Sequence, residues 1–164
     1  MKRDLTYAEV AQALRVGAGG QLFWLVNSNP RARAGSVAGS IDRQGYVDLQ
    51  YRGVRMLGHR VVWLLTYGEW PSAMLDHIDG DRSNNDPSNL RICTNSQNQS
   101  NRKAVGQTQF KGVTWHRQAK RFQAQCGKRY LGLYKDAEQA ARAYDDEARR
   151  VYGSYARLNF GSAA

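Results

Sequence analysis

The most informative stretch of this chain is LDHIDGDRSNNDPSNLR, which spans residues 75–91. It places a carboxylate, Asp76, directly before His77, and two side-chain amides follow that histidine by 12 and 21 residues, at Asn89 and Asn98. Carboxylate and amide oxygens suit a hard divalent ion such as Mg²⁺. A neutral imidazole accepts a proton from water near neutral pH. The pattern therefore predicts a metal site with an adjacent base.

Two other interpretations of this stretch stay open. An Asx-rich loop can use the same side chains only to cap its own turns. The run Asp79-Gly80-Asp81 also resembles part of a calcium loop. The ligand spacing and the final Glu of an EF-hand are missing, which disfavours calcium.

The flanking segments predict short helices and strands. Thr6 and Glu9 have the spacing of a capping box at the start of a helix. Periodicity and turn residues predict helices over 5–16 and 59–67, and strands over 21–26, 45–51 and 54–57. Residues 74–89 are expected to form a loop between short strands, and a polar helix capped by Thr94 is expected over 94–102.

The C-terminal third has a different period. It predicts strands over 110–115, 121–125 and 129–134, followed by a helix over 136–152 that Asp136 caps. The alanine-rich face of this helix suits close packing on a sheet. The sequence thus predicts an α+β protein in which a small three-stranded antiparallel sheet packs on one helix. The expected domains are residues 1–103 and 109–164, joined by a linker over 104–108.

The composition limits the class of protein. The chain has 164 residues, enough for one domain or two small ones, and 41% of them are apolar. Mean hydropathy is −0.67, no apolar run approaches the ~20 residues of a membrane span, and the start does not resemble a signal peptide. Cys93 and Cys126 fit neither a metal pattern nor a disulfide framework. We therefore expect a reduced, cytoplasmic protein with no membrane partner.

The positive charge is concentrated in one part of the chain. Lys and Arg number 24 against 14 Asp and Glu, and the 49 residues from Pro87 to Lys135 contain ten bases and no acid. Such a tract predicts a face that follows nucleic-acid phosphates rather than a merely solvated surface. Aromatic and amide side chains that alternate with these bases are expected to join them. The expected DNA-binding residues are Arg91, Arg102, Lys103, Lys111, Trp115, Arg117, Lys120, Arg121, Gln123, Gln125, Lys128 and Arg129.

Residues 5–103 resemble the HNH nucleases, specifically the phage and intron-encoded homing endonucleases. The motifs that carry the resemblance are Ala38-Gly39, Gly45-Tyr46, His59-Arg60, Gly68-Glu69-Trp70-Pro71, Asp76-His77-Ile78-Asp79-Gly80-Asp81, Asn89-Leu90-Arg91 and Gln97-Asn98. In that family, two short strands and a helix clasp one divalent ion. The resemblance therefore implies an HNH (ββα-metal) module that uses one Mg²⁺ or Mn²⁺ ion.

The same resemblance implies roles for individual residues. Asp76 and Asn98 would ligate the metal, His77 would be the general base, and Asn89 would hold the His77 ring by its side-chain oxygen. Asn101 is a substitute metal ligand. The zinc-binding cysteine pairs of some relatives are missing, so no structural zinc is expected. Two further histidines are not expected to be catalytic: His59 reads as structural although it could approach the site, and His116 could touch phosphate.

Residues 109–160 resemble the Apetala-two/ethylene-response-factor DNA-binding domain, which also occurs attached to phage HNH nucleases. The motifs are Lys111-Gly112-Val113, Tyr130-Leu131-Gly132-Leu133-Tyr134, Ala137-Glu138-Gln139-Ala140-Ala141-Arg142-Ala143-Tyr144-Asp145 and Ala156-Arg157-Leu158-Asn159-Phe160. Thr114 stands where the plant domains have Arg, and Phe122 stands where they have Trp. Their base preference therefore does not transfer.

The two resemblances together predict a homing-type endonuclease. It would hydrolyse a phosphodiester in double-stranded DNA to leave 5′-phosphate and 3′-hydroxyl ends, and it would need no small-molecule cofactor. The alternative is a non-catalytic, sequence-specific DNA-binding regulator that keeps the HNH fold as a scaffold. An RNA-binding module fits the charge but not the site. A phage-like origin and a bacterial host cell are expected.

Overall fold

The computed structural model describes residues 4–30, 32–104 and 108–161, and it divides the chain into two units. The N-terminal unit is Met1–Thr94, and the C-terminal unit is Asn95–Ala164. Both units mix helices with small antiparallel sheets, as an α+β protein should. Residues 105–107 of the expected linker lie outside the described residues. None of the helices in the described part of the chain is long and apolar enough to cross a bilayer.

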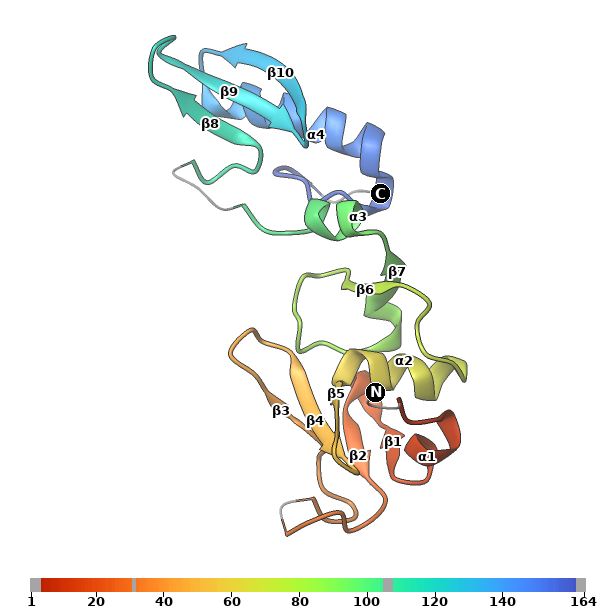
Figure 1. The fold of residues 1–164 in the computed structure, drawn as a ribbon. Coiled ribbons are helices and arrows are strands. Elements are labelled where there is room, and N and C mark those ends of the chain that lie inside the picture. Colours follow the sequence, from red (N-terminus) through yellow and green to blue (C-terminus); the bar gives the residue numbers. More distant parts are fainter. Residues whose placement is uncertain (1–3, 31, 105–107, 162–164) are drawn as a thin grey trace. The chain divides into compact units, whose positions relative to one another are not determined.

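The N-terminal unit contains three small sheets and two α-helices (Figure 1). Its elements are α1 (Tyr7–Ala11), β1 (Leu14–Val16), η1 (Ala18–Gly20), β2 (Leu22–Trp24), β3 (Ser40–Ile41), β4 (Val47–Tyr51), β5 (Val54–Leu57), α2 (Gly58–Tyr67), β6 (Met74–His77), η2 (Pro87–Asn89) and β7 (Leu90–Cys93). The antiparallel pairings are β1 with β2, β3–β4–β5 in that order, and β6 with β7. The start of the expected loop over 74–89 is therefore strand.

The first helix is shorter than its periodicity predicts. The capping box forms as expected, because the Thr6 hydroxyl accepts from the Glu9 backbone and the Glu9 carboxylate accepts from that of Thr6. The helix ends at Ala11, and β1 then pairs with β2. The apolar residues at the end of the expected helix are buried in this strand instead, with Leu14 opposite Trp24. Tertiary pairing outweighs helix propensity here.

Helix α2 is the centre of the N-terminal core. Val61, Val62 and Leu64 are almost completely buried on it. Gly68 ends the helix in the left-handed region, with φ 84°, as a C-cap glycine does. Leu90, the first residue of β7, belongs to the same core. Burial of Leu90 anchors the β6–β7 pair, which carries Asp76 and His77.

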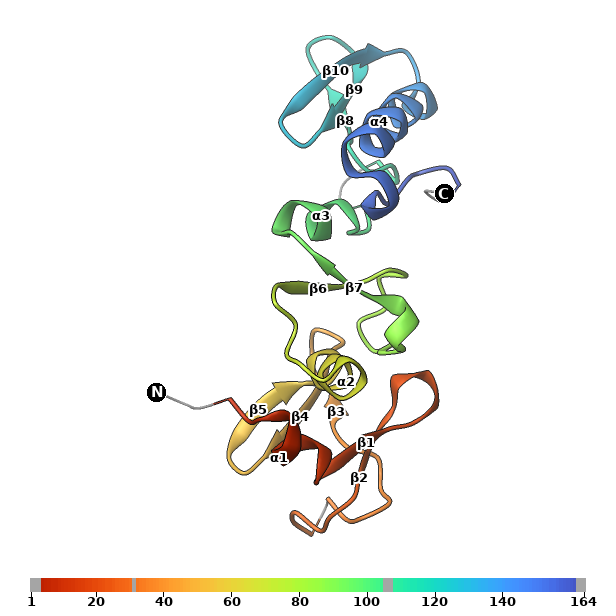
Figure 2. The ribbon, with the colours of Figure 1, turned by 90° about the vertical axis from the view of Figure 1, so that its right-hand side faces the viewer.

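The C-terminal unit is a three-stranded sheet with one long helix on one face (Figure 2). Its elements are α3 (Asn95–Ser100), β8 (Val113–His116), β9 (Arg121–Cys126), β10 (Arg129–Tyr134), α4 (Ala137–Tyr152) and η3 (Gly153–Tyr155). The sheet order is β10–β9–β8, and both pairings are antiparallel. Ala140 and Ala141 are fully buried against Val113 and Ala124, so small side chains let the helix approach the sheet closely.

A polar clasp fixes the end of this unit. The buried Asp145 carboxylate accepts from the backbone N–H groups of Asn159 and Phe160 and from the Asn159 amide. Asn159 in turn bonds both backbone groups of Lys111. Gly112 follows with φ 73°, and a Cβ there would lie 2.0 Å from the Tyr144 ring. The motifs around residues 111, 144 and 159 therefore stabilise one another.

Candidate functional site

The β6–β7 pair brings the candidate site residues of the N-terminal unit together. In its register, Asp76 faces Arg91 and His77 faces Leu90. Asp76 and His77 are each 5% exposed, so both titratable groups are held inside the protein. Buried polar groups of this kind need partners, and their partners define the geometry of the site.

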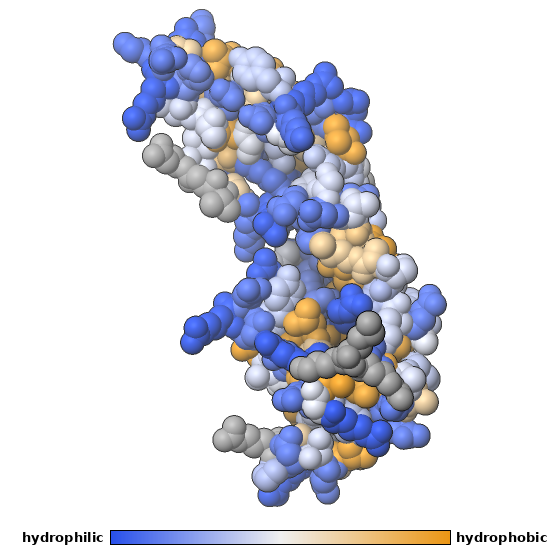
Figure 3. All heavy atoms as spheres, in the orientation of Figure 1, coloured by the Kyte–Doolittle hydropathy of each residue, from blue (hydrophilic) through white to orange (hydrophobic). Residues whose placement is uncertain are grey.

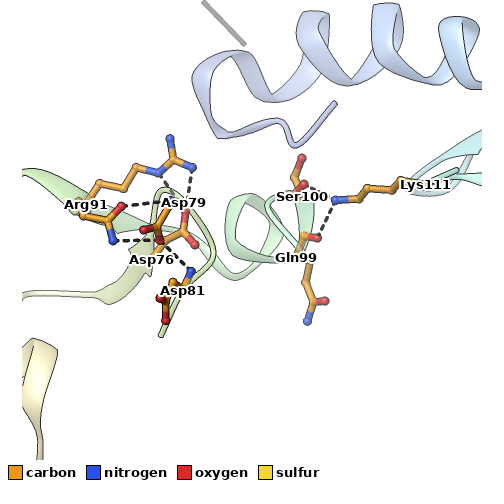
Figure 4. A network of polar contacts seen from close by, with 8 residues as sticks. Asp76, Asp79, Asp81, Arg91, Gln99, Ser100 and Lys111 are labelled. Carbon is orange, nitrogen blue, oxygen red and sulfur yellow. Dashed lines mark hydrogen bonds and ion pairs between the residues drawn. The ribbon is translucent and has the colours of Figure 1, made fainter. Parts of the chain in front are cut away.

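The partner of Asp76 is Arg91. Its Nη2 and Nε donate to Oδ2 of Asp76 at 2.8 and 2.9 Å, as Figure 4 shows. The pair is largely shielded, because the Arg91 side chain is only 15% exposed. Arg91 is expected from its charge to contact DNA. In the structure, the cross-strand register instead pairs Arg91 with the buried Asp76 carboxylate, and contact of Arg91 with DNA stays a prediction.

The imidazole of His77 is held by Asn85. Nε2 of His77 lies 3.1 Å from Oδ1 of Asn85, and both residues are buried. The amide oxygen can only accept a hydrogen bond, so the tautomer with the proton on Nε2 fits this contact. In that tautomer, a base would act through Nδ1.

Asn89 has a different role from the one expected. Its Oδ1 accepts from the backbone N–H of Asp79 at 3.1 Å, and its Nδ2 donates to Asp79 Oδ1 and to the carbonyl of Asn84. Asn89 therefore closes the loop over residues 78–89, and the ring contact expected of it comes from Asn85. In the structure, the amide oxygen beside the His77 ring is that of Asn85, and the side chain of Asn89 bonds to the loop instead.

The position of Asn85 depends on two glycines. Gly20 has φ +71°, and a Cβ there would lie 2.0 Å from the Asn85 carbonyl oxygen. A Cβ on Gly58, at the start of α2, would lie 3.0 Å from the Asn85 amide nitrogen. In the sequence, nothing distinguishes Asn85 from its neighbour Asn84 as the partner of His77. The signal that could have found it is the pair Gly19-Gly20, far upstream.

Asp79 organises the same loop. Its carboxylate accepts from the backbone of Asp81 and from the side-chain amides of Asn84 and Asn89. Burial raises the pKa of Asp79, but these hydrogen bonds outweigh burial and leave the pKa below its ordinary value. Figure 4 shows Asp79 and Asp81 beside Asp76 and Arg91. The interpretation of this loop as an Asx-rich, self-capping turn is therefore correct for Asp79, Asp81 and Asn89.

Two rings, those of His59 and Tyr46, pack beside the candidate base His77. The His59 ring lies edge-on to the His77 ring, with centroids 5.1 Å apart, and the Tyr46 ring lies 5.4 Å from His59 and 6.0 Å from His77. His59 is 6% exposed, and its Nδ1 has no hydrogen-bond partner among the described residues. Burial, helped by the nearby His77 and Arg60, lowers the pKa of His59 to about 4. His59 does approach the site, as a neutral ring.

The donor set fits a Mg²⁺-type ion better than zinc. Within the described ranges, no cluster of three His, Cys, Asp or Glu side chains is arranged to hold a metal. Mg²⁺ usually keeps several waters and binds through one or two carboxylates together with substrate phosphates. Asp76 can provide such a carboxylate. The expected amide ligands, Asn98 on α3 and Asn101 after it, belong to the C-terminal unit.

The strand register divides the C-terminal sheet into two faces. Residues opposite each other in an antiparallel pair share a face. Val113 lies opposite Ala124 on the face covered by α4. The residues of the other face, here called the outer face, are Thr114, His116, Arg121, Gln123, Gln125, Tyr130 and Leu133. The part of this sheet visible in Figure 3 is mainly hydrophilic.

Two residues expected on the open face lie on the helix side instead. Trp115 pairs with Phe122, with ring centroids 4.8 Å apart, and is 45% exposed at the sheet edge. Arg129 pairs with Cys126, and its Nη1 lies 3.1 Å from Glu147 on α4. Tyr130 and Leu133 take places on the outer face that were not expected. The bulge between Tyr130 and Gly132 shifts the alternation, and a bulge is hard to foresee from sequence.

Lys111 is also engaged within its unit. Its ammonium donates to the carbonyls of Gln99 and Ser100, as Figure 4 shows, and to that of Arg102, all at the C-terminal end of α3. Burial, together with Arg157, lowers the pKa of Lys111 to about 8. This cation caps the helix, and its expected contact with DNA stays a prediction. The bases of that set that are exposed in the structure are Arg102, Lys103, Arg117, Lys120, Arg121, Lys128 and Arg129.

Comparisons with known proteins show what the segment around the site is similar to. Residues 57–100 match the HNH endonuclease family, and this segment includes α2, the β6–β7 pair and α3. The chain is also similar to a solved structure described as DNA binding and cleavage by the HNH homing endonuclease I-HmuI. The identity is 24%, the TM-score is 0.44, and the match covers 59% of this chain and 55% of that chain. The chain thus matches little more than half the length of that protein.

Proposed function

We propose that this chain is a DNA endonuclease of the HNH type, in which His77 is the general base. One observation carries the proposal: His77 is buried beside Asp76, and its Nε2 lies 3.1 Å from Oδ1 of Asn85, which holds the ring in one orientation. This arrangement lies inside the segment that matches the HNH endonuclease family. A carboxylate next to an oriented neutral imidazole suits metal-assisted hydrolysis.

The proposed reaction is hydrolysis of a phosphodiester. Nδ1 of His77 takes a proton from water while the water oxygen forms a bond to phosphorus. The bond from phosphorus to the 3′ oxygen breaks, and that oxygen takes up a proton. The products are a 5′-phosphate and a 3′-hydroxyl end.

Asp76 is the proposed metal ligand of the N-terminal unit. A Mg²⁺ or Mn²⁺ ion bound there would neutralise charge on the phosphate and on the departing oxygen. Arg91 holds the carboxylate in one orientation through two hydrogen bonds. Asn98 is proposed as a second ligand, with Asn101 as its substitute, on the sequence pattern alone.

The C-terminal unit is the proposed duplex-binding part. Its exposed bases carry the attraction to phosphates, and the outer face of the sheet offers Arg121, Gln123 and Gln125. A sheet of this size can enter the major groove, where amide and guanidinium groups read base edges. Double-stranded DNA is therefore the proposed partner.

The test is nicking of a supercoiled plasmid in Mg²⁺ and in EDTA. His77→Ala should abolish most cleavage, because loss of a general base costs about 10²–10⁴ in rate. Duplex affinity should change little, because the C-terminal bases remain. Circular dichroism and a melting curve establish that the variant is folded. Wild-type rates in folded His77→Ala, or cleavage that survives complete chelation, would contradict the proposal.

The second candidate is a non-catalytic DNA-binding regulator. The Asp76–Arg91 pair favours it, since this pair satisfies the carboxylate without a metal. On this hypothesis the protein binds duplex DNA but does not cleave it with Mg²⁺ or Mn²⁺. The same plasmid assay, run beside a gel-shift measurement, separates the two functions.

A further inference from the structure

Arg82 is held beside the candidate active site by two interactions. It lies in the loop over residues 78–89, where its Nη1 donates to the carbonyl of Gln44 at 2.9 Å. Its Cζ lies 4.8 Å from the centroid of the Tyr46 ring, as in a cation–π contact. Because one hydrogen bond and one ring fix the guanidinium, it is a positioned group rather than a freely moving surface cation.

Tyr46 connects this guanidinium to the candidate base. The same ring that contacts Arg82 lies 6.0 Å from the His77 ring and 5.4 Å from the His59 ring. All these groups belong to the N-terminal unit. Only the Tyr46 ring thus connects Arg82 to His77 in this chain of contacts. Arg82 lies outside the acid-free tract, from which the sequence predicts DNA contacts.

No described carboxylate neutralises the charge of Arg82. In the described part of the chain, no carboxylate forms an ion pair with Arg82, whereas Arg91 is paired with Asp76 and Arg55 with Asp48. A guanidinium has five N–H donors, and Gln44 takes one of them. The remaining donors of this partly buried group suit an anion with several oxygens.

We infer that Arg82 is a phosphate ligand for the DNA strand on which His77 acts. The inference rests on the proposed function and deepens it by naming a residue that holds the substrate. A guanidinium binds two phosphate oxygens through parallel N–H groups, which a lysine cannot reproduce. Contact with Tyr46 restricts the side chain before DNA arrives, so less conformational entropy is lost on binding. Its role is to position a backbone phosphate at or next to the cleaved bond.

The first experiment measures duplex binding without divalent ions, over a series of salt concentrations. Arg82→Gln keeps a donor for Gln44 but removes the charge, and it should make the log–log salt slope shallower by about 0.9, the value for one phosphate contact. Arg82→Lys should restore most of the slope. Arg55→Gln is the matched control, because Arg55 is exposed but already paired with Asp48, and its slope should equal that of the wild type. An unchanged slope in folded Arg82→Gln would overturn the inference.

The second experiment measures single-turnover cleavage at saturating protein. Arg82→Gln and Arg82→Lys should both cleave at least about tenfold more slowly, because neither has the fork that orients the phosphate. Equal rates for Arg82→Lys and the wild type would contradict the positioning role. The binding series contains no metal and so does not depend on cleavage. If the wild type binds but never cleaves, while Arg82→Gln still loses one phosphate contact, the proposed function fails and the phosphate contact stands.

Discussion

The candidate site of the N-terminal unit and the outer face of the C-terminal sheet differ in how their polar side chains are held. In the N-terminal unit, Asp76 and His77 are each 5% exposed and are held by Arg91 and Asn85. On the outer face of the C-terminal sheet, Arg121 is exposed, and within the described residues its guanidinium contacts the carbonyl of Lys120. A buried, partnered group keeps one geometry, as proton transfer requires. An exposed cation can adjust to a long polyanion.

This difference shows why a count of bases is a poor guide to contacts. Three bases of the acid-free tract, Arg91, Lys111 and Arg129, have partners inside their own units. Arg82 lies outside that tract, and among the described residues it contacts the Gln44 carbonyl and the Tyr46 ring but no carboxylate. If the buried site performs the chemistry and the exposed sheet binds DNA, substitutions in the N-terminal site should alter cleavage rates and stability. Substitutions on the sheet should instead alter the salt dependence of DNA binding.

The largest effect is expected at Asn85. Asn85→Leu has a similar volume but removes the acceptor for Nε2–H of His77, so the tautomer and the ring orientation are no longer imposed. We expect cleavage to slow by about 10²–10³-fold, as when the partner of a catalytic histidine is lost, with duplex affinity within about twofold of wild type. Single-turnover kinetics and a gel shift measure the two quantities.

Asn89→Leu is the matched comparison for Asn85. It removes three hydrogen bonds that close the loop but none to His77. Its main effect should be a loss of about 1–3 kcal/mol of unfolding free energy, with a smaller loss of rate. A larger loss of rate in Asn89→Leu than in Asn85→Leu would return the orienting role to Asn89.

The next effect is a pH dependence of stability caused by the buried, neutral His59. Its pKa in the folded protein is about 4, below the ordinary value of 6.5, so between these pH values the unfolded state binds a proton that the folded state does not. The free energy of unfolding should therefore fall as the pH is lowered from 6.5 to 4, by roughly 3 kcal/mol. Urea denaturation at several pH values measures this, and His59→Phe should lack most of the slope. An equal slope in His59→Phe would contradict the assignment.

Much of the fold could be predicted because local signals agree with the tertiary structure. The strand over 129–134 and the helix begun by Asp136 appear almost as expected. The predicted length of the first helix is wrong, because pairing of Leu14 with Trp24 outweighs helical periodicity. Short apolar segments fit either state, and contacts distant in sequence decide between them.

The candidate site could be predicted only in part. The neighbours Asp76 and His77 carry chemistry that the sequence displays directly. The role of Asn85 depends on Gly20 and Gly58, which are distant in the sequence and leave room for it. The pairing of Arg91 follows from a strand register that periodicity alone does not fix. Residue types could thus be predicted, but their partners could not.

A smaller effect is expected at Lys111. Lys111→Met keeps the length of the side chain but leaves the carbonyls of Gln99, Ser100 and Arg102 without their donor. We expect about 1–2 kcal/mol less unfolding free energy, since hydrogen bonds from a charged donor are worth about that much. The salt slope of duplex binding should not change, because this ammonium is committed to the end of α3. A slope shallower by about 0.9 would show that Lys111 contacts phosphate after all.

The smallest effect separates the two faces of the C-terminal sheet. Arg121 lies on the outer face, whereas Arg129 lies on the helix side and is paired with Glu147 at 3.1 Å. Arg121→Gln should make the salt slope shallower by about 0.9 and weaken duplex binding by less than about tenfold. Arg129→Gln should change the slope less, because Glu147, which also pairs with Arg150, offsets part of its charge. Fluorescence anisotropy over a salt series measures both slopes. If Arg129→Gln loses as much slope as Arg121→Gln, DNA contacts the edge of the sheet beside α4, and the outer face is not the DNA-binding surface.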